Sequence, residues 1–250
     1  MIILRKYNID DRYRYLAKSY SDGEQNKFYR NGYYYKLNKS GNEGYVEHLA
    51  SILLSCTDLD KGDYVSYEYC MINNKLGCRC KDFVNNKGQF LTASKLYERY
   101  IGNDSLSEKI AGFRNATERL NFLIDLYGLV GIDKQISLSY FRKIFLLDYI
   151  IINTDRHIRN IGVVNYGGGY KPAPIFDNGC ALDTNRSGVH TSCTISGSFS
   201  EQLIATGYPI QPIFKVDTKL LMKKLANEPN LYEKVMLMNR LKIAINEGLI

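Results

Sequence analysis

Four polar residues in the second half of the chain have the types and spacing that phosphoryl transfer requires. Asp155, His157 and Asn160 form the pattern Asp-x-His-x-x-Asn, and Asp177 follows further on. Enzymes that move the γ-phosphoryl group of ATP place an Asp at the incoming hydroxyl, and hold Mg²⁺ with an Asn and a second Asp. We therefore predict Asp155 as the catalytic base or orienting acceptor, and Asn160 and Asp177 as Mg²⁺ ligands.

The flanking sequence favours a functional site over a polar loop in which Asp and Asn occur by chance. Residues 145–152 and 161–164 are strongly apolar, and the polar cluster lies between them. Such an arrangement is typical of a site held on rigid elements. His157 either fixes this loop or acts directly in catalysis. Arg156 and Arg159 either contact phosphate or are exposed to solvent.

The same residues carry a family resemblance. Residues 154–160 read Thr-Asp-Arg-His-Ile-Arg-Asn, which resembles the catalytic loop of the HipA-like Ser/Thr kinases, typically Thr-Asp-x-His-x-x-Asn. The loop is also similar to the Asp-Arg-His-x-x-Asn loop of phosphatidylinositol 3- and 4-kinases. Phe176 and Asp177 stand where both families place the metal-binding Asp.

A polar segment near the N-terminus extends the resemblance. On its residues alone, the stretch 21–27 predicts a plain hairpin turn. HipA-like kinases carry a phosphate loop here of the form Ser-x-Gly-x-Gln-x-Lys, and they can phosphorylate its Ser themselves. The matching positions, which the resemblance assigns to nucleotide binding, are Ser21, Gly23, Gln25 and Lys27.

The element after this loop predicts a lysine for the nucleotide phosphates. Residues 28–37 form aromatic strands around Asn31 and Gly32, a strong signal for a two-residue hairpin turn. Lys36 ends this aromatic run, where a buried lysine needs a charged partner. We expect Lys36 to reach the α- and β-phosphates; Lys27 and Lys39 are the alternatives.

A helix should supply the partner of that lysine. Ser40 and Glu43 form a potential capping box, and apolar residues follow at helical spacing. Glu43 and Glu47 lie four positions apart, so they share one helix face, and either can pair with Lys36. The Asn-Glu pattern of HipA-like proteins favours Glu43 as the partner of Lys36. In the alternative, Glu43 only completes the helix cap and has no part in binding the lysine.

The remaining pattern predicts the elements that position the catalytic loop. We expect strands over 64–71 and 76–83, a hinge at 81–84 that contacts adenine, and a hairpin of 161–165 with 170–176 around three glycines. Residue 91 onward should turn helical, and residues 180–200 should form an activation-segment loop. Helices are predicted over 115–128, 137–153, 217–226 and 231–247.

Composition restricts the protein class. The chain has 250 residues, 45% of them hydrophobic, and a net charge of +7. No apolar run is long enough to span a membrane, and no nucleic-acid motif accompanies the charge. Six scattered cysteines fit neither a zinc site nor a disulfide framework, which favours a reduced, cytoplasmic setting.

Together these observations predict an α+β, two-lobed protein kinase-like fold. A small antiparallel-sheet lobe should cover residues 1–83, and a mostly helical lobe residues 84–250. The resemblance implies an enzyme that uses ATP and Mg²⁺ to phosphorylate Ser or Thr of a protein, itself included, with a possible regulatory partner. The alternatives are a phosphoinositide or small-molecule kinase, and a non-catalytic nucleotide- or protein-binding module.

Overall fold

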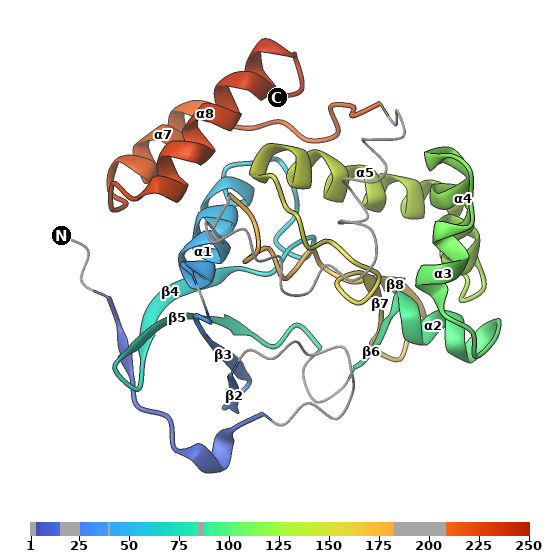
Figure 1. Ribbon diagram of the computed structural model, residues 1–250, viewed down its shortest axis with the longest axis horizontal. Helices are drawn as coiled ribbons and strands as arrows, with labels where there is room; N and C mark the ends of the chain where they lie inside the picture. The colour runs from blue at the N-terminus through green and yellow to red at the C-terminus, as the bar shows by residue number, and fades with distance from the viewer. Residues whose placement is uncertain (1–3, 16–25, 40, 85–87, 183–208) are drawn as a thin grey trace.

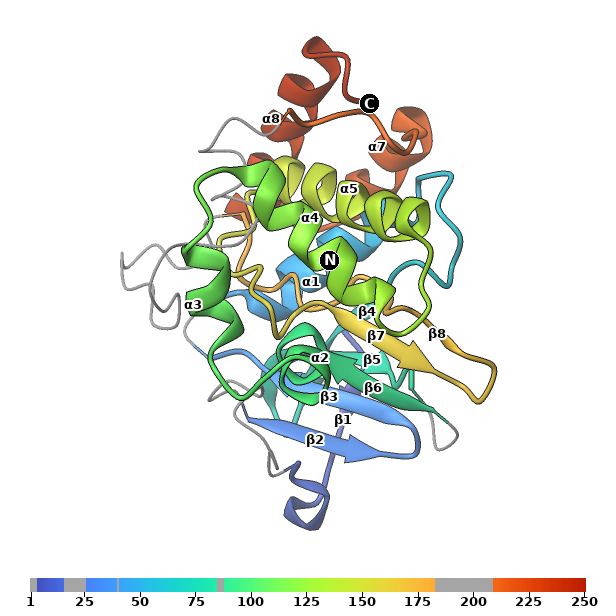
Figure 2. The ribbon, with the colours of Figure 1, turned by 90° about the vertical axis from the view of Figure 1, so that its right-hand side faces the viewer.

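The computed structural model describes residues 4–15, 26–39, 41–84, 88–182 and 209–250 (Figure 1). The fold is a mixed α+β arrangement. Both views place a five-stranded sheet at one end of the molecule and the two C-terminal helices at the other (Figures 1 and 2). Among the described residues, no helix is long and apolar enough to cross a membrane.

The larger sheet has the strand order β1-β4-β5-β3-β2. Its strands are β1 (Lys6–Tyr7), β2 (Lys27–Arg30), β3 (Tyr33–Leu37), β4 (Tyr67–Ile72) and β5 (Lys75–Lys81). Two hairpins build it, and their turns at Asn31-Gly32 and Asn73-Asn74 all have positive φ, between 49° and 76°. The predicted β2–β3 hairpin is therefore confirmed, as is the pairing of β4 with β5 around Asn73-Asn74.

The prediction of a purely antiparallel sheet is wrong at one edge. β1 runs parallel to β4, whereas the other strand pairs of this sheet are antiparallel. The side chain of Asn73 fixes this edge, because it accepts from Ile9 N and donates to Ile9 O, each at 2.7 Å. A tertiary contact from a turn thus decides the direction of β1.

Helix α1 (Glu43–Leu54) packs across the sheet and begins at Glu43, with Asn42 as its N-cap. The predicted partner in the capping box, Ser40, lies outside the described residues. Gly44 allows the close approach: a Cβ there would lie 2.5 Å from the backbone carbon of Gly77 on β5. The helix can therefore rest directly on the sheet backbone.

A second sheet of three antiparallel strands joins distant segments. β7 (Gly162–Asn165) and β8 (Tyr170–Pro172) form the predicted hairpin, with β8 ending earlier than expected. β6 (Gln89–Thr92) pairs with β7, although the sequence pattern predicts helix from residue 91. Helix α2 (Ala93–Tyr100) begins directly after β6, where the Thr92 side chain accepts from Lys95 N.

The helices predicted after residue 100 are present with small changes in their bounds. Asn115 caps α4, Asp217 caps α7, and Asp133 caps α5 three residues earlier than predicted. The α5 helix ends before Asn153 because Ile152 adopts a left-handed conformation with φ 51°. The observed helices are α3 (Leu106–Ala111), α4 (Ala116–Gly128), α5 (Lys134–Ile151), α7 (Thr218–Ala226) and α8 (Tyr232–Asn246).

One hydrophobic core connects α1 to the helical part of the chain. Tyr45 and Leu49 of α1 are fully buried in the same cluster as Phe141 and Phe145 of α5 and Leu237 of α8. Smaller clusters cover the sheet faces. The division into lobes at residues 83 and 84 stays a prediction.

We predict that Gly44→Ala destabilises the fold by about 1–3 kcal/mol, because the added methyl group would collide with the backbone of Gly77. Urea denaturation gives the free energy of unfolding. Gly62→Ala is the matched control, since a Cβ at Gly62 would meet no atom within 4 Å. Equal stability of the two variants would show that α1 can move away from the sheet without loss.

Candidate active site

A buried arginine supports the loop that carries Asp155. Arg156 is 0% exposed, and its guanidinium forms a two-pronged pair with Asp148 of α5, with Nε–Oδ2 at 3.1 Å and Nη2–Oδ1 at 3.0 Å. The expectation that Arg156 contacts phosphate or solvent is therefore wrong. The side chain turns inward because Asp148, 3% exposed, lies on the buried face of α5.

The same guanidinium connects the loop to the segment that contains Asp177. Arg156 Nη1 donates to the carbonyl of Phe176 at 2.6 Å, and Nη2 donates to Asn178 Oδ1 at 2.6 Å. It also reaches the carbonyl of Asn160 at 3.4 Å. One buried cation thus fixes the residues on both sides of Asp177 relative to the loop 153–160.

Amide side chains set the conformation of the loop itself. Asn153 donates to Asp148 Oδ1 at 3.1 Å and accepts from the backbone N–H of Asp155 at 3.0 Å. Asn160 Nδ2 donates to the carbonyl of Asp155 at 3.0 Å. Because this bond occupies the nitrogen end of the Asn160 amide, the oxygen end is the atom that can bind a cation.

Asp177 meets the sheet lysine that the sequence predicts. Asp177 has a left-handed backbone, with φ 61°, and its Oδ1 lies 2.6 Å from Lys36 Nζ. Its backbone N–H donates to the Tyr67 hydroxyl at 3.3 Å. Burial would raise the pKa of Asp177, but the charges of Lys36 and Lys27 lower it well below its ordinary value. Asp177 is therefore an ionised carboxylate near neutral pH.

The partner of Lys36 on α1 is Glu47. Lys36 Nζ lies 3.1 Å from Glu47 Oε1, and both side chains are buried. Glu43, which the resemblance favours, instead accepts from the backbone N–H groups of Lys39 and Gly41 at 3.2 and 3.1 Å. Glu43 thus binds the backbone that precedes α1. Of the two glutamates that the sequence leaves as possible partners of Lys36, the structure has Glu47 in this role.

A second bond of Glu47 completes the network. Its Oε2 accepts from the backbone N–H of Asn178 at 2.9 Å. Burial would lower the pKa of Lys36, but the neighbouring Asp177, Tyr67 and Glu47 raise it well above its ordinary value. Lys36 therefore stays protonated between two carboxylates, and it brings α1, β3 and the segment after β8 to one point.

These groups open into a cleft of about 370 Å³. Lys36, Asn160 and Asp177 line it, and so does Lys27, which pairs with Lys36 across β2 and β3. Ser21, Gly23 and Gln25 lie outside the described residues, as does the predicted activation-segment loop from residue 183 onward. Asp155 is not among the residues that line this cleft; Asn153 and Asn160 hold its backbone in the adjoining loop.

Residues of the predicted hinge also line this cleft. Asp82, Phe83 and Val84 line the cavity. Phe83 packs against Phe90 and Phe176, with ring centroids 5.4–5.5 Å apart. This aromatic cluster gives the cleft an apolar wall besides its charged groups, which suits a ligand with a flat ring and an anionic tail.

His157 is a neutral side chain within the loop. The backbone N–H of Arg159 donates to its Nδ1 at 3.2 Å, so the proton of the neutral ring is on Nε2. Burial lowers the pKa of His157 below the ordinary 6.5, even though Asp155 and Asp177 oppose this shift. The bond within the loop fits the interpretation in which His157 fixes loop conformation.

The sequence analysis did not predict the buried residues that support the site through hydrogen bonds. Asp148, Asn153 and Asn178 do not line the cleft, yet all three are buried and bond to the catalytic loop or to Arg156. The available signal was Asp148, a lone carboxylate within the apolar stripe of α5, eight positions before Arg156. A charge in that place needs a buried partner.

Comparisons with known proteins identify the fold. No family model matches the chain, and no curated protein matches it. A crystal structure of the proinflammatory kinase CtkA of Helicobacter pylori aligns with a TM-score of 0.66 at 18% identity, covering 98% of this chain and 95% of that one. HipA, in the toxin–antitoxin complex of Shewanella oneidensis MR-1 with HipB and operator DNA, aligns with a TM-score of 0.50 at 14% identity, covering 96% and 68%.

The resemblance to HipA-like kinases is thus confirmed at the level of the fold. Both alignments span nearly the whole chain, 98% and 96% of it. At these identities the likeness shows a kinase-like fold, and the chemistry must be argued from the side chains.

We predict that Arg156→Leu destabilises the protein by about 3–5 kcal/mol, because Asp148 would be left as a buried charge without its partner. Thermal or urea unfolding measures the loss. Arg99→Leu, at an exposed position on α2, is the matched control and should change stability by about 0.5 kcal/mol or less. A small effect of Arg156→Leu would show that Asp148 is not buried as a charge.

The pKa values of the two described histidines should be shifted in opposite directions from the ordinary 6.5. Burial would lower the pKa of His48, but hydrogen bonds to Glu228 and to the Tyr67 carbonyl, together with nearby Glu68, raise it above 6.5. His48 therefore stabilises the fold at low pH, and this contribution is lost as pH rises through its raised pKa. His157, with a lowered pKa, opposes folding increasingly as pH falls below about 6.5.

NMR titration of the histidine ring signals measures the pKa values of His48 and His157. The variants His48→Gln and His157→Gln assign the signals. We expect the His48 signal to titrate above 6.5 and the His157 signal below it. The reverse order would contradict the contacts described for both rings.

Proposed function

We propose that this protein is an ATP- and Mg²⁺-dependent kinase that transfers the γ-phosphoryl group to Ser or Thr hydroxyls of a protein. The observation that carries the proposal is the convergence at Lys36. This lysine contacts Glu47 and Asp177, the latter 141 positions away, at the charged end of a cleft that Asn160 also lines. Lysine, helical glutamate, asparagine and aspartate are the set that kinases place around nucleotide phosphates.

Each residue of the set has a proposed role. Lys36 binds the α- and β-phosphates, and Glu47 keeps it charged and directed into the cleft. Lys27 adds positive charge beside it, and the loop positions Ser21, Gly23 and Gln25 would cradle phosphate oxygens. Glu43 supports this arrangement indirectly, through the backbone at the entrance of α1.

The donor set near Asp177 fits Mg²⁺. Asn160 and Asp177 would hold the ion with an amide oxygen and a carboxylate, both hard ligands, and nucleotide phosphates supply the remainder in such sites. Bound Mg²⁺ would offset the negative charge that develops on the transferred group. Asp155 accepts the proton of the acceptor hydroxyl or orients it, and His157 keeps the loop in place.

The wider proposals follow from the same site. We infer a two-lobed arrangement with the division near residue 83, where the hinge meets the cleft. We also infer autophosphorylation at Ser21 of the phosphate loop and a cytoplasmic setting, and we expect a regulatory protein partner. The HipA of Shewanella oneidensis was solved with HipB and operator DNA; we extend neither of those partners to this chain.

The test is incubation with γ-labelled ATP and Mg²⁺, with and without a generic protein acceptor. We expect labelled protein from the wild type and a loss of about 10²–10⁴-fold in Asp155→Asn and Asp177→Asn. Mass spectrometry then locates the phosphate on Ser21 or elsewhere. Nucleotide binding without transfer would favour a non-catalytic module, and transfer to a phosphoinositide or metabolite alone would change the acceptor class.

The two glutamates of α1 provide a matched pair for this assay. Glu47→Gln removes the charge beside Lys36 and should lower kcat/KM about tenfold or more. Glu43→Gln keeps one of the two acceptor oxygens that bond to the backbone of Lys39 and Gly41 and leaves the contacts of Lys36 intact, so transfer should stay near the wild-type level. Equal losses in both variants would assign the effect to α1 folding instead of to Lys36.

A further inference from the structure

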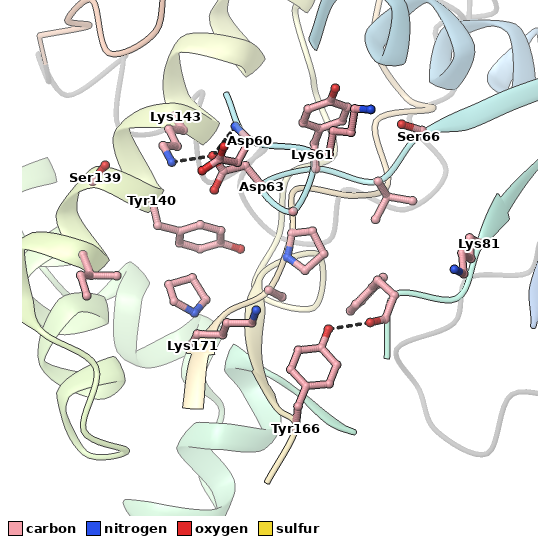
Figure 3. A pocket seen from close by; sticks show the side chains of 18 of the residues that line it. Asp60, Lys61, Asp63, Ser66, Lys81, Ser139, Tyr140, Lys143, Tyr166 and Lys171 are labelled. Atoms are coloured by element: carbon pink, nitrogen blue, oxygen red, sulfur yellow. Dashed lines mark hydrogen bonds and ion pairs between the residues drawn. The ribbon is translucent and has the colours of Figure 1, made fainter. Parts of the chain in front are cut away.

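A second cavity, of about 940 Å³, lies beside the hinge (Figure 3). Its walls come from the loop 60–66, the hinge 81–83, the first half of α5 and the segment 166–174. Val65, Asp82 and Phe83 line both this cavity and the nucleotide cleft. The proposed kinase activity makes no use of this space.

The cavity carries an excess of positive charge. Of its four lysines, Lys143 forms an ion pair with Asp63 at 2.9 Å. Among the residues that the structure describes, Lys61, Lys81 and Lys171 pair with no carboxylate. The lining also holds three acids, Asp60, Asp63 and Asp82, so its four lysines leave a net charge of +1. Asp82 accepts from the Tyr29 hydroxyl at 3.1 Å and from the Val84 N–H at 2.9 Å. An anion would therefore be attracted to this cavity.

Flat side chains form much of the remaining wall. Tyr140 is 6% exposed and presents a ring that lines the cavity, and in Figure 3 both Tyr140 and Lys171 extend toward its middle. The Lys171 ammonium group lies 4.9 Å from the centroid of the Tyr166 ring. The further flat or apolar residues of the lining are Tyr64, Ile136, Pro172 and Pro174. Such walls favour an aromatic ring.

We propose that this cavity binds a small aromatic anion, which acts as an effector of the nucleotide site. The volume lies within the range of pockets that enclose small organic ligands. The ring would stack among the tyrosines and prolines, and the anionic group would pair with Lys171 and Lys61. This inference goes beyond the proposed kinase function, and binding itself requires no turnover.

A direct hydrogen bond connects the cavity to the hinge. The Tyr166 hydroxyl donates to the carbonyl of Phe83 at 2.6 Å, while its ring carries the contact to Lys171. A ligand that engages Lys171 therefore alters the position or rigidity of Tyr166, and through it the hinge. Because coupling between two binding sites is reciprocal, nucleotide must change the affinity of the effector by the same factor.

The first experiment uses 1-anilinonaphthalene-8-sulfonate, an aromatic anion whose fluorescence rises on binding. We expect saturable binding to the wild type and an affinity at least about tenfold lower for Lys171→Glu, since one charge is removed and an opposite one added. Lys75→Glu makes the same charge change at an exposed position in the β4–β5 hairpin, away from the cavity, and should bind like the wild type. Equal affinities in Lys171→Glu and Lys75→Glu would overturn the proposed site.

The second experiment separates the cavity from the nucleotide cleft. A non-hydrolysable ATP analogue at saturation should shift the dye's dissociation constant about fivefold or more without displacing it. Complete competitive displacement would place the dye in the nucleotide cleft and overturn the proposal. Dye binding requires no turnover, so failure of the proposed kinase function leaves this result intact.

The Tyr166→Phe variant tests the coupling. It keeps the ring beside Lys171 and removes the hydroxyl that bonds to Phe83. Dye affinity should stay within about twofold of the wild type, whereas the shift caused by the ATP analogue should disappear. A wild-type shift in Tyr166→Phe, or no shift in the wild type, would refute the effector role.

Discussion

The buried pair of Arg156 and Asp148 is the constraint on which the site depends. A guanidinium that is 0% exposed must satisfy its donors inside the protein. Arg156 does so with Asp148, Asn178 and the carbonyls of Phe176 and Asn160, and these partners hold the loop 153–160 against the segment that contains Asp177. Asn160 and Asp177 line the cleft while this buried neighbour bonds to the backbone beside them.

Helix α1 is the second support, and the C-terminal helices hold it. Asn42 donates to Glu233 Oε1 at 3.0 Å, the Tyr45 hydroxyl donates to the carbonyl of Pro229 at 3.0 Å, and His48 lies 3.3 Å from Glu228. Helix α8 also packs against α5, and α7 packs against α1. The two C-terminal helices therefore help to fix the position of Glu47 relative to the loop that follows α5. The end of the chain thus contributes to a site formed by its beginning and middle.

A fold at 14–18% identity to solved kinases is compatible with this design. Most of the chain has to supply helices and strands of suitable length and burial, which many sequences can do. The charged network is less tolerant, since each buried ion requires its particular partner. The cavity behind the hinge is formed by the same elements, but three of its four lysines pair with no carboxylate of the described residues. This surplus of charge distinguishes it from the packed interior.

Local signals in the sequence determined much of the fold: the turns at Asn31-Gly32 and Asn73-Asn74, and the caps of α4 and α7. They also located Lys36 and Asp177, whose contact the structure contains. Only the tertiary structure chose Glu47 over Glu43 and turned Arg156 inward. The physical reason is range. Turns and caps depend on neighbouring residues, whereas the partner of a buried charge depends on how helices and sheets pack.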